Sequence, residues 1–172
     1  MKIITYPDFI LRSSGLPVKE EQEGLRDLMR HLIATLQQSS SGVGLAANQI
    51  GFQANMFVMD AERSKASFTP IVIANPTFKG YGNRVELQEG CLSFPGVFER
   101  VQRWEACEAK YDVVDFQTGK FTRKEEALTG LESQIFQHET EHLTGKLLID
   151  NLDARLQARI TKRMEKRKSR GW

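Results

Sequence analysis

Abundant cysteine, long apolar runs and an apolar leader are all missing from this sequence. It has two cysteines in 172 residues, Cys91 and Cys107, which excludes a disulfide-stapled scaffold, and a chain this long can bury enough apolar surface to fold without one. Apolar runs such as Met56 to Met59 and Ile71 to Ala74 are only a few residues long, which excludes a transmembrane helix. No basic start followed by an apolar stretch opens the chain, so we expect no secretory signal and a reducing compartment.

The composition that remains is that of a soluble globular protein, with 40% hydrophobic and 27% charged residues. The length predicts a single domain, residues 1–172. The net charge of +2 is uneven, because Arg155 to Arg170 holds eight Lys or Arg and one acid and sums to +7, which leaves −5 for the rest. This basic C-terminal segment, about residues 153–170, either contacts nucleic acid or is a solvated helix end.

The residue pattern predicts one amphipathic helix followed by several strands. Apolar residues at helical spacing predict the helix from Leu25 to Leu36. The strands are predicted at residues 55–60, 69–74, 100–115 and 121–127, the third as one strand or two. Asn75 and Pro76 are predicted to end the second strand, and a turn at 117–120 is predicted to lead into the last one.

Two further helices are predicted after the strands. One covers residues 131–143 and ends at Gly145, and the other covers 153–168 with Asp153 as its N-cap. The apolar stripe of the last helix is one residue wide and consists of Leu156, Ile160 and Met164. Its final turns are therefore expected to project from the body. Because strands and helices do not alternate, the predicted fold class is α+β.

The most specific signal is the run His138-Glu139-Thr140-Glu141-His142. Two histidines at i and i+4 lie on one face of a helix, one turn apart, so their ring nitrogens can bind the same metal ion. Glu139 follows the first histidine and can act as a general base on a water in that site without being a ligand. The alternative is a helix that carries two ordinary surface histidines.

A metal site needs a third protein ligand. A metzincin-type protease would carry a histidine where this chain has Leu148, and the only glutamate after His142 is Glu165, which lies in the basic segment. Cys91 lies in a turn-rich loop of glycine and proline that displays its thiol. It can complete a Cys-His-His site with one position left open, or it is a reduced structural cysteine.

A glycine-rich stretch, Gly42 to Gly51, supplies a third candidate segment. Its glycines let the backbone approach a ligand closely, and Gln49 offers a neutral NH₂ donor that suits an oxyanion. The Gly-Lys-Ser/Thr ending of a phosphate loop is missing. A tight turn into a strand explains the stretch equally well.

Together, these three segments resemble the motifs of the peptide deformylase family. Residues 42–51 resemble its first motif, G-x-G-L-A-A-x-Q, residues 89–93 read E-G-C-L-S like its second, and residues 137–142 read Q-H-E-x-x-H like its third. The order and spacing of the segments also fit. The resemblance covers most of the chain, roughly residues 6–152.

The resemblance implies an α+β fold in which antiparallel or mixed sheets pack around the metal-binding helix, with an N-terminal helix and a basic C-terminal helix. It implies a metal-dependent hydrolase that removes the N-terminal formyl group from the formylmethionine of nascent polypeptides and releases formate. It also implies one divalent metal ion per chain, usually Fe²⁺, for which Zn²⁺ or Ni²⁺ can substitute.

The same resemblance implies roles for individual residues. The implied metal ligands are Cys91, His138 and His142. Glu139 is the implied catalytic acid and base, and Gln49 with the backbone N–H of Leu92 is the implied oxyanion hole. Glu89 is expected to play a structural part, with Arg103 as its partner.

Selection of methionine needs an apolar slot beside the metal. The candidate walls of this slot are Val43, Leu87, Leu131 and Ile135. Leu131 and Ile135 precede the histidines on the same side of the helix. The alternative is that these two residues belong to the hydrophobic core and do not contact the substrate. Gly44 and Leu45 of the glycine-rich stretch, together with Glu89, complete the predicted substrate-binding set.

Two positions depart from the family pattern. Glu141 occupies a position where relatives usually have Asp. Its longer side chain is expected to shift a contact that supports the metal ligands. Phe98, seven residues after Cys91, stands where many bacterial relatives carry Arg. An apolar contact to the substrate is expected there in place of a polar one.

The expected partners are N-formylmethionyl peptides and, through the basic C-terminal helix, the ribosome; no membrane or DNA partner is expected. The expected location is the cytoplasm, or the matrix or stroma of an organelle with formylated translation. Two other classes stay open. One is a zinc endopeptidase of the H-E-x-x-H type, and the other is a non-catalytic ribosome- or RNA-binding relict.

Overall fold

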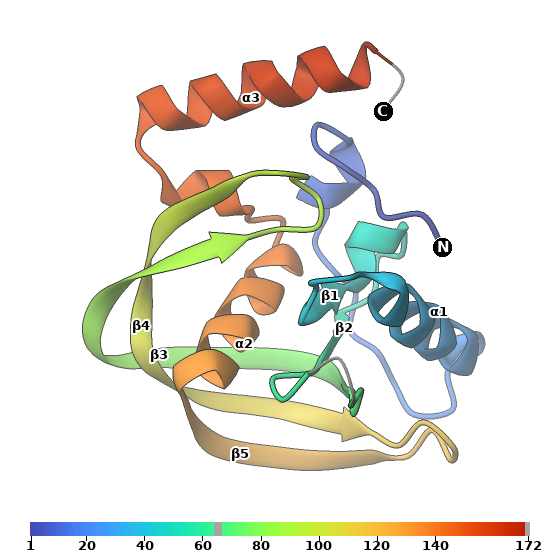
Figure 1. The fold of residues 1–172 in the computed structure, drawn as a ribbon. Coiled ribbons are helices and arrows are strands. Elements are labelled where there is room, and N and C mark those ends of the chain that lie inside the picture. The colour runs from blue at the N-terminus through green and yellow to red at the C-terminus, as the bar shows by residue number, and fades with distance from the viewer. Residues whose placement is uncertain (64–66, 171–172) are drawn as a thin grey trace.

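One antiparallel sheet curves around a central helix in the computed structural model (Figure 1). The structure describes residues 1–63 and 67–170. The strands are β1 (Gly44–Ala46), β2 (Met56–Met59), β3 (Ile71–Gly90), β4 (Phe98–Val114) and β5 (Phe121–Thr129). The helices are α1 (Leu25–Gln38), α2 (Gly130–His142) and α3 (Ala154–Lys168), with 3₁₀ turns η1 (Phe9–Arg12), η2 (Ala47–Ile50) and η3 (Leu148–Asn151).

The five strands lie side by side in chain order, and every neighbouring pair is antiparallel. Because the helices are separate from this sheet and do not alternate with its strands, the predicted α+β class is confirmed. The central helix α2 lies in the hollow formed by the long strands β3 and β4 and contacts all five strands, while α1 packs across β1 and β2 (Figure 1). The fold therefore carries the histidine pair of α2 into the middle of the molecule.

The prediction that a strand ends at Asn75 and Pro76 is wrong, because β3 continues through both residues to Gly90. The pairing of β3 with β4 shifts register between Ala74 and Thr77, so the two residues form an irregularity within the strand. Asn75 has a positive φ of 52°, and its side-chain amide bonds to both the N–H and the C=O of Val18, at 2.9 and 2.8 Å. A contact with a distant segment thus stabilises what looks like a turn in the sequence.

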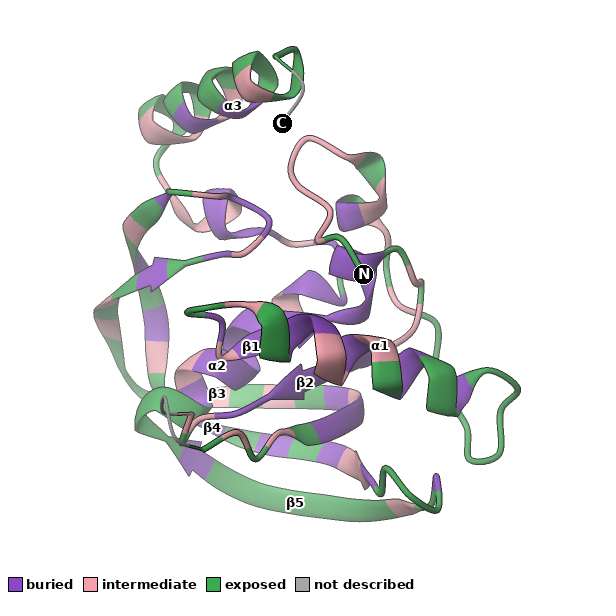
Figure 2. Cartoon of the chain, turned by 45° about the vertical axis from the view of Figure 1, so that its right-hand side comes forward, coloured by how far each residue is buried: buried purple, intermediate pink, exposed green. Residues whose placement is uncertain are grey.

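The burial pattern agrees with the predicted amphipathic first helix. Leu25, Leu28, Met29, Leu32 and Leu36 of α1 are buried. They pack in one apolar cluster with residues of β1 and β2, and a second cluster joins α2 to the sheet. Figure 2 shows α2 buried along most of its length, whereas α1 and α3 keep exposed outer faces. Among the described residues, no helix is both long and apolar enough to cross a membrane.

The expectation that the last turns of the basic helix project from the body is also wrong. Asp153 caps α3 as predicted, accepting the N–H of Leu156 at 2.9 Å. Ile160 and Met164 are buried in a third apolar cluster together with Cys91, Phe94 and Val97. A narrow apolar stripe is sufficient here because distant parts of the chain supply a matching apolar surface. The helix therefore packs against the segment that carries Cys91.

Candidate metal centre

Helix α2 brings His138 and His142 together because they are one turn apart on its face. The ring centroids of the two imidazoles are 5.1 Å apart. Gly145, with a φ of 76°, follows the helix as predicted, and its N–H bonds to the carbonyl oxygen of His142. A second contact holds the same carbonyl, since the Asn48 side-chain amide donates to it at 2.6 Å. The end of the helix that carries the histidines is thus tied to η2.

Cys91 meets this pair from the loop that follows β3. One ligand atom from each of Cys91, His138 and His142 lies within 4.8 Å of the other two. The Sγ of Cys91 is 3.2 Å from Nε2 of His142, near the separation of about 3.5 Å expected for sulfur and nitrogen ligands of one tetrahedral ion. All three residues are at most 9% exposed. This convergent set of one sulfur and two nitrogens fits a divalent metal ion.

Glu89 orients the first histidine from behind. Its Oε2 lies 2.9 Å from Nδ1 of His138, which leaves Nε2 of that ring for the metal position. Arg103 donates to both oxygens of Glu89, each at 2.8 Å, and this confirms the expected partnership. Burial pushes the pKa of Glu89 up, but hydrogen bonds from Arg103 and His138 outweigh it and lower the pKa to about 2. Glu89 is therefore a buried, ionised carboxylate.

Arg103 also connects the site to Glu141. The Arg103 side chain is 2% exposed, and its third nitrogen donates to Glu141 at 2.6 Å. Glu141 in turn accepts hydrogen bonds from Lys146 at 2.5 Å and from Asn151 at 3.0 Å. The carboxylate that departs from the family pattern thus links the arginine to the segment that follows α2.

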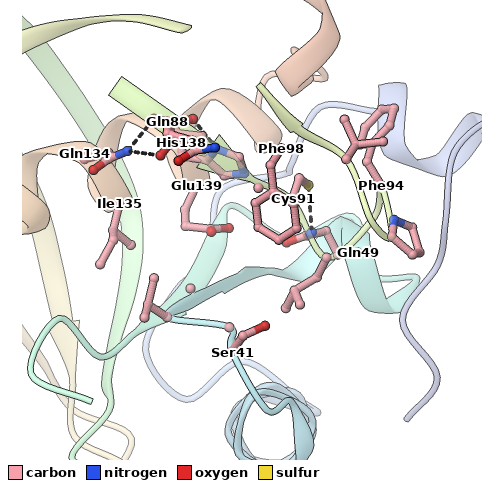
Figure 3. Close-up of a pocket in the computed structure, with 18 of the residues that line it drawn as sticks. Ser41, Gln49, Gln88, Cys91, Phe94, Phe98, Gln134, Ile135, His138 and Glu139 are labelled. Carbon is pink, nitrogen blue, oxygen red and sulfur yellow. Dashed lines mark hydrogen bonds and ion pairs between the residues drawn. The ribbon is translucent and has the colours of Figure 1, made fainter. Parts of the chain in front are cut away.

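Gln49 lies beside the cysteine with its amide held in one orientation. Its carbonyl oxygen accepts the N–H of Ala46 at 2.8 Å, so its NH₂ group faces the site (Figure 3). That group is 3.1 Å from Oγ of Ser93 and 3.7 Å from Sγ of Cys91. Leu92, the next residue after the cysteine, lines the same cavity. Gln49 and Leu92 thus reach the cavity from two separate segments of the chain.

Glu139 points into the cavity and is 5% exposed. Its Oε2 has no hydrogen-bond partner among the described residues. Burial raises the pKa of Glu139 to about 7, and the neighbouring charges of His138, Glu89 and Arg103 act in opposing directions. A buried carboxyl group with a pKa near neutrality can both accept and donate a proton.

The cavity around these groups has a volume of about 390 Å³. Of the predicted substrate-binding residues, Val43, Gly44, Glu89, Leu131 and Ile135 line it. The other two do not. Leu45 is fully buried in the cluster beneath α1, and Leu87 is half-buried in β3 away from the lining.

Two residues of the site, Ser93 and Gln134, were not given a role from the sequence. Ser93 receives the Gln49 amide and donates to the carbonyl of Ile4 at 2.8 Å. Gln134 donates to Glu89 at 3.2 Å. Its position four residues before His138, on the same helix face, is a signal that could have identified it. Ser93 is the last residue of the E-G-C-L-S segment, but that segment does not show that its hydroxyl group contacts Gln49 and Ile4, which lie far away in the chain.

Comparisons with known proteins agree with this geometry. The family model described as polypeptide deformylase matches residues 1–158. A peptide deformylase of Endomicrobium trichonymphae is 35% identical to the chain, and the match covers 99% of this chain and 97% of that protein. A peptide deformylase of Pseudomonas aeruginosa is also 35% identical, and the match covers 96% of this chain and 95% of that protein. A crystal structure of a peptide deformylase from Legionella pneumophila is 34% identical, covers 98% of this chain and 95% of its own, and has a TM-score of 0.82. The peptide deformylase of Plasmodium falciparum is 28% identical over 99% and 98%, with a TM-score of 0.83.

Proposed function

Because the chain belongs to the peptide deformylase family, we propose that Cys91, His138 and His142 hold one Fe²⁺ ion and that Glu139 moves the proton of the reaction. The chain is a hydrolase that removes the N-formyl group from nascent polypeptides and releases formate. The convergence of one thiol and two imidazoles beside a buried carboxyl group is the observation that carries this assignment.

The donor set supports a divalent ion of intermediate softness. Cys-His-His is an ordinary zinc set, and sulfur with imidazole suits Fe²⁺ and Ni²⁺ as well, so the preference for iron rests on the family resemblance. When bound, such an ion lowers the pKa of a water in the site toward neutrality. The carboxylate of Glu89 supports this role of the site, because it fixes the orientation of the His138 ring.

The protein groups divide the remaining work. Glu139 accepts the proton of the attacking water and passes it to the leaving amine, which leaves formate and a free N-terminus; its pKa of about 7 suits both steps. The Gln49 amide and the Leu92 N–H donate to the formyl oxygen as negative charge develops on it. The apolar side chains of Val43, Leu131 and Ile135 receive the methionine side chain in the cavity.

Release of formate from a formyl-Met peptide tests this function directly. We expect formate release that a hydroxamate chelator blocks, and no cleavage of unformylated peptides. A zinc endopeptidase would cut internal bonds of unformylated peptides, and a binding relict would release nothing. Either result would overturn the assignment.

We further propose that α3 docks on the ribosome. Its outer face exposes Arg155, Arg159, Lys162, Arg163, Lys166 and Lys168. Lysine and arginine contacts to RNA phosphates make such binding steeply salt-dependent. Removal of α3 is a poor test, because Ile160 and Met164 are part of the core.

The better test reverses charge and leaves the fold intact. The double variant Lys162→Glu with Lys166→Glu should bind ribosomes more weakly and with a shallower salt dependence than the unmodified chain. A matched control reverses Lys19 and Lys124, which are exposed elsewhere on the molecule. Equal weakening in both pairs would refute a specific role for α3.

Residues 1–172 are proposed to act as one catalytic domain. In support of this, Leu11 near the start of the chain and Met164 near its end belong to the same apolar cluster. The proposed location is the cytoplasm, or the matrix or stroma of an organelle in which translation starts with formylmethionine.

A further inference from the structure

The guanidinium group of Arg63 binds four backbone carbonyls in one short part of the chain. Its Nη1 donates to the carbonyl oxygen of Leu36 at 2.8 Å and to that of Gly42 at 2.6 Å. Its Nη2 donates to the carbonyl oxygens of Gln37 at 3.1 Å and Ser39 at 2.6 Å. One side chain thus joins the last turn of α1 to the loop that leads into β1.

The charge and the shape of this side chain both suit its place. The last carbonyls of a helix have no N–H partner within the helix and carry a partial negative charge, which favours a cation there. A guanidinium group presents its N–H donors in a fixed plane, so it can bind several carbonyls at once. In addition, Cζ of Arg63 lies over the ring of Phe68, 5.0 Å from its centroid. The guanidinium group is therefore held on its face as well as along its edge.

The loop that Arg63 binds continues into one wall of the cavity. Residues 41–44 line the cavity, and Figure 3 shows Ser41 on this side of it. The Val43 carbonyl accepts the N–H of Asp60 at 2.8 Å, so two residues of the segment after β2 hold this wall. Arg63 is itself a described residue and does not line the cavity. Any effect of Arg63 on the substrate must therefore pass through the wall.

Much of this loop is exposed to solvent. Ser40 and Ser41 are exposed and lie in no helix or strand. A hydrogen bond from the N–H of Gly42 to Oγ of Ser39, at 2.9 Å, lies within the loop and does not connect it to the rest of the molecule. Exposed loops with few buried contacts open easily. The hydrogen bonds from Arg63 therefore limit how far the loop can move.

We propose that Arg63 is a positioning residue, which keeps residues 41–44 in the shape that receives the methionine side chain of the substrate. This inference rests on the proposed function, because it requires a formylated methionine to enter the cavity. Arg63 contacts no reacting group, so it should affect binding that is the same in the ground state and in the transition state. Loss of such binding raises KM and leaves kcat unchanged.

Kinetics on a formyl-Met peptide and a formyl-Ala peptide of otherwise equal sequence test the proposal. Arg63→Ala should raise KM for the formyl-Met peptide about tenfold and keep kcat within about twofold. The formyl-Ala peptide should lose much less, because its single methyl group makes little contact with the wall. The ratio of kcat/KM for the two peptides should therefore fall, which a general loss of stability would not cause.

Guanidinium ion provides a second readout. At concentrations well below those that denature proteins, it should restore part of the formyl-Met preference to Arg63→Ala, because the free cation can bind the same carbonyls. Sodium ion at the same ionic strength should not. Arg63→Lys should be intermediate, since an ammonium group lacks the planar set of donors. Arg30→Ala is the matched control, because Arg30 lies on the surface of α1 and pairs only with Asp27 among the described ion pairs. It should leave the ratio unchanged, with or without guanidinium.

The outcomes separate this inference from the function on which it rests. Normal formate release with an unchanged ratio in Arg63→Ala would overturn the role of Arg63 alone. An equal loss on both peptides without rescue by guanidinium would also overturn it, since Arg63 would then only stabilise the fold. Should Arg63→Ala fail to fold, a ratio in Arg63→Lys equal to that of the unmodified chain would overturn it. No formate release from either peptide by the unmodified chain would overturn the proposed function, and this inference with it.

Discussion

The carboxylate of Glu139 lies directly against the α-carbon of Gly44. A Cβ built on Gly44 would be 2.5 Å from Oε1 of Glu139 and 2.8 Å from its Cγ. These two residues belong to α2 and β1, almost one hundred positions apart in the chain. Glu139 can therefore occupy this position only because residue 44 has no side chain.

Gly44→Ala should displace the Glu139 carboxylate and lower kcat by about 10²-fold, which is the typical cost of moving a reacting group by about 1 Å. Metal content should stay the same. Gly42→Ala is the matched control, because the three atoms nearest to its Cβ would be the ends of the side chains of Leu36, Ser39 and Leu92. These ends can move, so a much smaller loss is expected. Equal losses in the two variants would contradict this account.

Glu139→Ala should retain the metal and lose about 10²- to 10⁴-fold in turnover, the range for removal of a general acid and base. Cys91→Ala should instead lower the ratio of metal to protein, because it removes one of the three proposed ligands. Metal analysis and formate release on the same preparations separate the two effects. Near-normal rates in Glu139→Ala would refute its assigned role.

The iron form should lose activity in air faster than a nickel or zinc form. A thiolate beside ferrous iron is exposed to oxidation, and Cys91 is the proposed sulfur ligand. Residual formate release after timed exposure to air, with and without a reductant, measures the decay. Equal decay of all three metal forms would count against this prediction.

Replacement of Arg103 by Met should destabilise the fold by about 3–5 kcal/mol, because Glu89 would remain buried as an unpaired charge. Glu141→Asp should cost only about 1 kcal/mol, since the shorter arm gives up part of its contacts with Lys146 and Asn151. Chemical denaturation of both variants checks the contrast. Similar losses of unfolding free energy in the two variants would mean that Arg103 does not stabilise the fold by neutralising the buried charge of Glu89.

The ion pair of Asp150 with Arg12 should make stability depend on pH in the acid range. Burial pushes the pKa of Asp150 up, but the hydrogen bonds from Arg12 and from the N–H of Leu147 lower it on balance. A carboxyl group whose pKa is lower in the folded protein than in the unfolded chain stabilises the folded protein. This contribution is complete above the pKa in the unfolded chain, about 4, and it disappears as the pH falls through the pKa in the folded protein.

Asp150→Asn should therefore be less stable than the unmodified chain by about 1 kcal/mol at pH 7, and the difference should shrink below about pH 4. Thermal unfolding across pH gives both values. The control is Asp27→Asn, since Asp27 pairs with Arg30 on the surface and such exposed pairs contribute little. A difference that stays constant down to low pH would exclude the ion pair as its cause.

Local patterns carried much of the prediction. The helical spacing of apolar residues correctly predicted α1, and the i and i+4 spacing correctly predicted that the two histidines lie on one face of α2. The errors arose where a distant segment outweighs a local signal. Asn75 and Pro76 predicted the end of a strand. The backbone of Val18 forms hydrogen bonds with the Asn75 side chain, and the strand continues. Similarly, α3 packs down because the loop after Cys91 supplies its apolar partner surface.

By itself, the sequence determined the α+β class, the histidine pair and the three segments that carry donor groups, because these depend on residue type and on spacing within one element. Only the tertiary structure decided that Glu141 reaches Arg103, that Gly44 leaves room for Glu139, and that Leu45 and Leu87 lie outside the cavity. Such contacts join segments far apart in the chain. The packing of the whole molecule selects them, and no local pattern encodes which side chains will meet.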